Sequence, residues 1–114
     1  MILTARKAEG PQGLNQAVER LNKLPNISGH AVGIPSNVGV TEDIEKFVNK
    51  LKETESQIDI LVANAGATWG GPFEPTPDWS SKKILDLNVR GIFNLVRLYA
   101  MLVLLQFPSM RHSR

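Results

Sequence analysis

Hydrophobic residues in this chain alternate between short continuous runs and runs with helical spacing. Short apolar runs at 2–5, 30–34 and 58–62 each fit a β-strand. Between them, apolar residues recur at the i, i+3, i+4, i+7 spacing of one helix face; they are Leu14, Ala17, Val18 and Leu21, then Ile44, Phe47, Val48 and Leu51. This alternation predicts an α/β fold with a parallel sheet covered by helices.

Proline, glycine and threonine mark where these elements begin and end. Pro25 closes the first helix and Pro35 stops the second strand, while Thr41 fits the N-cap of the second helix. The third strand should be buried on both faces, because only Asp59 interrupts its apolar run. A loop rich in glycine and proline, 67–77, then precedes a long helix that starts near position 78 or 80 and ends at Phe107-Pro108.

Composition narrows the class of protein. The 114 residues fit one domain, and the net charge of +2 comes from interspersed side chains, which disfavours nucleic-acid binding. The chain has no cysteine, and His30 and His112 are too isolated to form a metal site, so we expect no metal and a reducing, cytoplasmic setting. The apolar stretch 99–107 is too short to span a membrane.

Two segments carry the most specific pattern. Residues 58–66 read Ile-Asp-Ile-Leu-Val-Ala-Asn-Ala-Gly, and residues 87–91 read Leu-Asn-Val-Arg-Gly. The tripeptide Asn64, Ala65, Gly66 leaves the carboxyl end of a predicted parallel strand, where small residues let a flat ligand approach the backbone; the alternative is an ordinary tight turn. Asn88 lies inside a predicted helix, where an asparagine is mildly unfavourable.

Together these segments resemble the classical short-chain dehydrogenase/reductase family. The resemblance implies a partial Rossmann-type doubly wound parallel sheet, with three strands alternating with three helices, over residues 1–107, followed by an unpatterned tail, 108–114. The loop after Gly66, with Thr68, Trp69 and Gly70, is similar to the 3-oxoacyl-acyl-carrier-protein reductase-like, rhamnolipid-type subgroup. We therefore expect a carbonyl substrate, with 3-oxoacyl compounds as one candidate.

The resemblance also assigns roles to single residues. Asn88 would serve the catalytic proton relay by disturbing its helix, and Asn64, Ala65 and Gly66 would lie beside the cofactor. Arg6, directly after the first strand, suits the 2′-phosphate of NADP, so NADP is favoured over NAD. Asn37 and Val38 occupy the place where the family usually has Asp followed by Val or Leu, next to the adenine; a turn asparagine is the alternative.

Several groups that the family uses have no counterpart in these residues. There is no Thr-Gly-x-x-x-Gly-x-Gly loop, and the only tyrosine, Tyr99, is followed four positions later by Val103 instead of a lysine. The resemblance places the family's first strand between the runs 2–5 and 58–62, so we expect unpaired strand edges.

These absences leave three interpretations. The chain is a fragment of an NADP-dependent oxidoreductase truncated at both ends and inactive alone, with cofactor binding by the fragment itself in question. A second interpretation is a non-catalytic module that pairs with a full-length relative, or with its own copy, through the apolar helix 88–107. The third is a truncated gene product without a stable fold.

Overall fold

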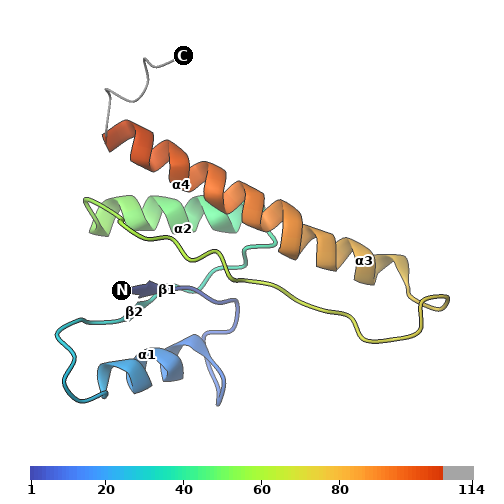
Figure 1. Cartoon of the computed structure of the whole chain (residues 1–114), viewed down its shortest axis with the longest axis horizontal. Coiled ribbons are helices and arrows are strands. Elements are labelled where there is room, and N and C mark those ends of the chain that lie inside the picture. Colours follow the sequence, from blue (N-terminus) through green and yellow to red (C-terminus); the bar gives the residue numbers. More distant parts are fainter. Residues whose placement is uncertain (107–114) are drawn as a thin grey trace. The chain divides into compact units, whose positions relative to one another are not determined.

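The computed structural model describes residues 1–106, with side chains described through Val103, and it consists of two compact units, Met1–Asn37 and Val38–Arg114. Each unit is described by itself. Figure 1 shows the order of the elements along the chain: two short strands with a helix between them, and then a set of longer helices.

The first unit is a parallel strand-helix-strand motif. Strand β1 (Ile2–Leu3) pairs with β2 (Val32–Gly33), with Ile2 opposite Val32 and Leu3 opposite Gly33. Backbone hydrogen bonds extend this ladder at both ends, from the Val32 N–H to the Met1 carbonyl and from the Ser36 N–H to the Ala5 carbonyl. The predicted strands at 2–5 and 30–34 are therefore confirmed in part, as shorter strands of two residues each within these runs.

Helix α1 (Leu14–Asn22) forms the connection between these strands. It begins after Gly13, and Leu14 is the buried residue on its apolar face. Its last residue, Asn22, reaches the second strand: Oδ1 accepts from the Ala31 N–H at 2.7 Å, and Nδ2 donates to the Ala31 carbonyl at 2.9 Å. The helix ends before Pro25, as the sequence predicts.

The second unit is built around helix α2 (Thr41–Thr54). Its buried residues are the four that the spacing predicts, Ile44, Phe47, Val48 and Leu51, and it packs against α4. The predicted N-cap role of Thr41 is wrong, because Val40 occupies that position and Thr41 is the first helical residue. The Thr41 hydroxyl instead accepts hydrogen bonds from Arg90 and Asn94, each at 3.3 Å.

The predicted long helix is present but changes its winding midway. It consists of α3 (Asp78–Leu85), a π-helical turn η1 (Asp86–Gly91) and α4 (Ile92–Gln106), which follow one another without a break. Figure 1 shows them as one continuous rod. The predicted stop at Phe107-Pro108 and the tail 108–114 lie outside the described residues.

The predicted third strand at 58–62 does not form. The only sheet among the described residues has two strands, and in this segment Ile60 and Val62 are 80% and 78% exposed, not buried on both faces. The physical reason is pairing, since a strand is stable only when its backbone groups bond to a neighbour and none of the described residues supplies that ladder. The α/β class with a parallel sheet is confirmed in partial form.

Candidate functional site

Asn88 holds the loop that follows the Asn-Ala-Gly tripeptide. Its side-chain Oδ1 accepts from the Ala67 N–H at 2.7 Å, and its Nδ2 donates to the Ala67 carbonyl at 2.8 Å. A Cβ added to Gly66 would lie 3.3 Å from the same Oδ1, a tight contact. Asn88 therefore fixes the backbone directly after Gly66, and a side chain at position 66 would crowd this contact.

The helix that carries Asn88 is distorted at that residue. The π-helical turn η1 spans Asp86–Gly91, so the disturbance expected around Asn88 is present as a wider turn. Turns of this kind are rare and occur frequently at functional sites, because they redirect backbone groups and side chains. The proton-relay role itself stays a prediction.

An ion-pair chain runs along the outside of this turn. Lys82 Nζ lies 2.5 Å from one oxygen of Asp86, and Arg90 Nε lies 2.9 Å from the other. Hydrogen bonds from Lys82 and then Arg90 hold the pKa of the Asp86 carboxyl below its ordinary value. Arg90 also donates to the Gly39 carbonyl at 3.1 Å, which ties η1 to the segment before α2.

Gly91 and Val38 form the second tie between η1 and that segment. A Cβ at Gly91 would overlap the Val38 carbonyl oxygen, far inside the 3.0 Å limit for real contacts, so only glycine allows this approach. Val38 is itself buried. Its predicted place beside a cofactor adenine is not tested, and the structure shows its carbonyl facing the helix backbone.

The tripeptide Asn64, Ala65, Gly66 is exposed. The Asn64 N–H donates to the Val62 carbonyl at 3.2 Å, and residues 57–70 run without helix, turn or bend. Open backbone with small side chains suits close approach by a planar ligand, as the sequence predicts. The predicted place of these residues beside the cofactor stays a prediction.

Arg6 and Asn37 belong to the first unit. Arg6 is exposed, and among the described residues its guanidinium has no ion pair, so it is available to a phosphate. Asn37 is half-buried and already engaged in an interaction. Neither role is tested, and Arg6 is the better placed of the two to meet a ligand.

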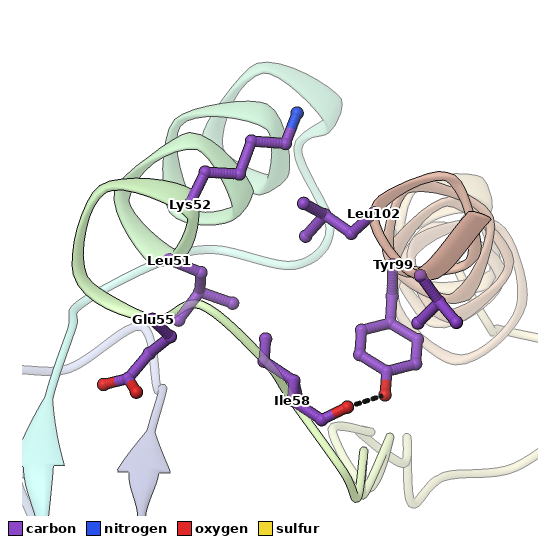
Figure 2. A pocket seen from close by; sticks show the side chains of 7 residues that line it. Leu51, Lys52, Glu55, Ile58, Tyr99 and Leu102 are labelled. Carbon is purple, nitrogen blue, oxygen red and sulfur yellow. Dashed lines mark hydrogen bonds between the residues drawn. The ribbon is translucent and has the colours of Figure 1, made fainter. Parts of the chain in front are cut away.

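Tyr99 has a structural role that the sequence did not predict. Its hydroxyl donates to the Ile58 carbonyl at 2.8 Å, and both residues line a small hollow of about 10 Å³ (Figure 2). The hollow is lined by Leu51, Lys52, Glu55, Ile58, Tyr99, Leu102 and Val103. The helical spacing of apolar residues predicts that Tyr99 lies on an apolar helix. It does not predict the hydrogen bond to Ile58, which is 41 residues away in the sequence.

The loop after the tripeptide contains an aromatic pair. Trp69 and Trp79 meet edge to face, with ring centroids 4.8 Å apart and an interplanar angle of 83°. The pair joins the loop to the start of α3. No group of acidic or histidine side chains in residues 1–106 could hold a metal ion, and no helix in that part of the chain is long and apolar enough to cross a membrane.

Comparison with known proteins identifies the class. Residues 3–106 match the short chain dehydrogenase family, so the chain belongs to this family of oxidoreductases. It is 30% identical over 69 residues to the rhamnolipids biosynthesis 3-oxoacyl-[acyl-carrier-protein] reductase of Pseudomonas aeruginosa, covering 60% of this chain and 27% of that protein. It is 34% identical over 84 residues to a 3alpha-hydroxysteroid dehydrogenase of Mediterraneibacter gnavus, covering 71% and 32%.

A solved structure supports the same fold. The Pseudomonas aeruginosa RhlG/NADP active-site complex superimposes with a TM-score of 0.74 at 27% sequence identity, covering 85% of this chain and 35% of that chain. The chain thus spans about a third of the length of the relatives that it matches. The Rossmann-type class and the family resemblance are confirmed.

Proposed function

We propose that this chain forms the central part of an NADP-dependent short-chain reductase that acts on a carbonyl substrate, with 3-oxoacyl compounds as the candidate class. The observation that carries the proposal is the Asn88 side chain bonded to both backbone groups of Ala67, within a family match over residues 3–106. This contact stabilises the loop beside the open backbone of 64–66. Bound NADPH would supply the hydride.

The choice of NADP rests on Arg6. An arginine after the first paired strand, with no acid before Glu9, suits a phosphate better than a ribose hydroxyl. In the natural protein, isolated at its native length, we expect Arg6→Glu to lower the affinity for NADP⁺ relative to NAD⁺ by at least about tenfold, as loss of a charge-assisted phosphate contact would. Arg20→Glu on α1 is the matched control. An unchanged NADP⁺ to NAD⁺ ratio would contradict the assignment.

We further propose that residues 1–114 alone do not catalyse hydride transfer. Tyr99 is the only tyrosine, and its hydroxyl donates to the Ile58 carbonyl. Val103 occupies the position, four residues later, where the family has its catalytic lysine. We expect no consumption of NADPH by the purified chain with a 3-oxoacyl thioester. Measurable turnover that disappears in Asn88→Ala would show that the chain is catalytically complete.

A second candidate function is pairing with a full-length relative or another copy through the helical rod. Its support is a stripe of exposed apolar side chains at helical spacing, Leu85, Val89, Phe93 and Val96. Co-expression of the tagged chain with a full-length relative tests it. We expect co-purification that Phe93→Lys removes and that Lys83→Glu, a charge change off the stripe, leaves intact.

A further inference from the structure

Arg90 lies in η1, two residues after Asn88, and each of its three guanidinium nitrogens donates a hydrogen bond. Nε donates to Asp86 at 2.9 Å, Nη1 to the Thr41 hydroxyl at 3.3 Å, and Nη2 to the Gly39 carbonyl at 3.1 Å. The guanidinium group is planar and rigid, so three acceptors fix its orientation more tightly than a single ion pair would. Arg90 therefore joins its own turn to a separate segment of the second unit.

Two further contacts hold η1 against the segment that leads into α2. The Val38 carbonyl packs against Gly91 more closely than any side chain at that position would allow, and Asn94 donates to the Thr41 hydroxyl at 3.3 Å. Thr41 is the first residue of α2, whose apolar face is buried. The turn η1 is therefore anchored to the start of a helix that is itself held by its core residues.

The winding of η1 determines the direction of the Asn88 side chain. A π-helical turn contains about one residue more than an α-helical turn, and each residue of an α-helix turns the chain by roughly 100°. If residues 86–91 rewound as an α-helix, α3 would turn against α4 by about that angle, and Asn88 would lose its direction toward Ala67. Because π-helical winding is rare, contacts from outside the turn are needed to favour it here.

We propose that Arg90 is a positioning residue of the candidate site, which keeps η1 in its π-helical winding so that Asn88 holds the Ala67 backbone. Asp86 and Arg90 are the first and fifth residues of η1, so the bond between them spans the turn. The other two Arg90 bonds tie the turn to the segment before α2. Arg90 thus acts on Ala67 through Asn88, and only the consequence for a bound cofactor rests on the proposed function.

Amide exchange at Ala67 in the natural protein, isolated at its native length, tests this role. We expect Arg90→Ala to lower the protection of Ala67 at least about threefold. Arg90→Lys should restore little of it, because an ammonium group keeps the charge but cannot make the three planar bonds. Lys82→Ala is the matched control, since Lys82 pairs with the same Asp86 carboxylate from α3, and it should change Ala67 protection by less than about twofold. Unchanged protection in Arg90→Ala, or full recovery in Arg90→Lys, would overturn the proposal.

A double variant separates positioning from a general loss of stability. Because Arg90 acts through Asn88, Arg90→Ala should lower Ala67 protection no further once Asn88 is replaced by alanine. Protection of Phe47, in the buried face of α2, should stay the same in all of these variants. Losses at Ala67 that multiply in the double variant, or an equal fall at Phe47, would identify a general structural role and overturn the proposal.

A milder variant covers the case in which Arg90→Ala does not fold. Thr41→Val keeps the shape of the side chain but removes the hydroxyl that accepts from Arg90 and Asn94. We expect the same pattern at Ala67 with a smaller loss, again absent once Asn88 is alanine. No change at Ala67 in Thr41→Val would contradict the anchoring of η1 through α2.

Binding of NADP⁺ to the same variants measures the consequence for the cofactor. We expect Arg90→Ala and Asn88→Ala to weaken binding by similar factors, and the double variant to bind no more weakly than Asn88→Ala. Unchanged binding in Arg90→Ala, despite lower Ala67 protection, would overturn the extension of this role to the cofactor. A wild-type protein that binds no NADP⁺ would refute the proposed function, whereas Ala67 exchange would still decide the positioning role.

Discussion

In each of the two units, an asparagine side chain bonds to both backbone groups of an alanine. The segment next to that alanine forms a strand in the first unit but not in the second. In the first unit, Asn22 at the end of α1 bonds to both backbone groups of Ala31, and in the second, Asn88 in η1 bonds to both backbone groups of Ala67. Each asparagine amide offers one donor and one acceptor to the peptide group, as a neighbouring strand would. The bond lengths are similar in both.

The difference lies in the chain next to each clamped alanine. Ala31 leads directly into β2, which pairs with β1. The segment at 58–62, ahead of Ala67, finds no partner strand among residues 1–106. An asparagine therefore positions a backbone segment but does not make it a strand. A ladder of backbone bonds does that, and composition alone does not supply one.

The largest expected effect on stability comes from replacing a glycine in each unit, Gly91 in the second and Gly33 in the first. The two glycines differ in the atoms that an added side chain would meet. A Cβ at Gly91 would overlap the Val38 carbonyl, which cannot move aside, whereas one at Gly33 would meet the side-chain methyls of Leu14 and Val18 at 3.0–3.2 Å. We expect Gly91→Val to destabilise the second unit by about 3 kcal/mol and Gly33→Val to destabilise the first by about 1 kcal/mol. Urea unfolding measures both.

The two units can be followed separately in that experiment. Both tryptophans lie in the second unit, so tryptophan fluorescence reports Gly91→Val, and amide exchange of the β1–β2 ladder reports Gly33→Val. Gly70→Val is the control, because no heavy atom lies within 4 Å of its added Cβ. Equal losses from Gly91→Val and Gly70→Val would show that the Val38 contact does not stabilise the unit.

Sequence patterns predicted the elements whose contacts are local or repeat along one face. The buried face of α2 follows directly from its spacing, and the β1–β2 pair from two short apolar runs joined by a helix. The strand at 58–62 failed because its apolar composition says nothing about whether a partner is present. The cap position at Thr41 failed by one residue because its hydroxyl bonds to Arg90 and Asn94, residues distant in sequence.

In the candidate site too, local features could be predicted from the sequence and long-range contacts could not. The tripeptide at 64–66 and Asn88 could be singled out from sequence, since a mid-helix asparagine and a small-residue run are both unusual locally. That Asn88 bonds to Ala67, 21 residues away, could not be read from spacing. Nor could the Tyr99 bond to Ile58 or the approach of Gly91 to Val38, because each joins elements through tertiary packing.

A smaller loss of stability is expected when either asparagine that bonds to an alanine backbone, Asn22 or Asn88, is replaced. Asn22→Ala leaves both backbone groups of Ala31 without their partners in a part-buried setting, and we expect a loss of about 2 kcal/mol. Asn88→Ala acts at an exposed site where water replaces the amide, so about 1 kcal/mol is expected.

Amide exchange at Ala31 and Ala67 measures each clamp directly. Protection at Ala31 should fall in Asn22→Ala while protection at Ala67 is unchanged, and the reverse should hold for Asn88→Ala. Asn15→Ala is the matched control, because Asn15 is an exposed asparagine on α1 whose side chain donates to Glu9. If the Asn88 substitution left Ala67 exchange unaltered, the loop after Gly66 would be held by other contacts.

The smallest expected effect is a difference in how acid acts on the two units. Hydrogen bonds from Lys82 and Arg90 lower the pKa of Asp86, and a hydrogen bond from Lys23 lowers that of Glu19. A carboxyl whose folded pKa is depressed stabilises the fold above its unfolded pKa, and this contribution disappears as the pH falls through the folded value. Both contributions should therefore be lost only on acidification.

The consequences should differ, because the partners differ. Glu19 pairs with Lys23 inside α1, so its protonation should loosen only the end of that helix. Asp86 orients Arg90, which donates to the Gly39 carbonyl and the Thr41 hydroxyl, so its protonation should also weaken the tie between η1 and the start of α2. Relative to the intrinsic exchange rate at each pH, protection of the first α2 amides should fall below the unfolded pKa of aspartate in the wild type, and it should not change with pH in Asp86→Asn. If protection depended on acid in the same way in both proteins, Asp86 would not be the source of the pH dependence. The Arg90 contacts would then be surface pairs that do not stabilise the start of α2.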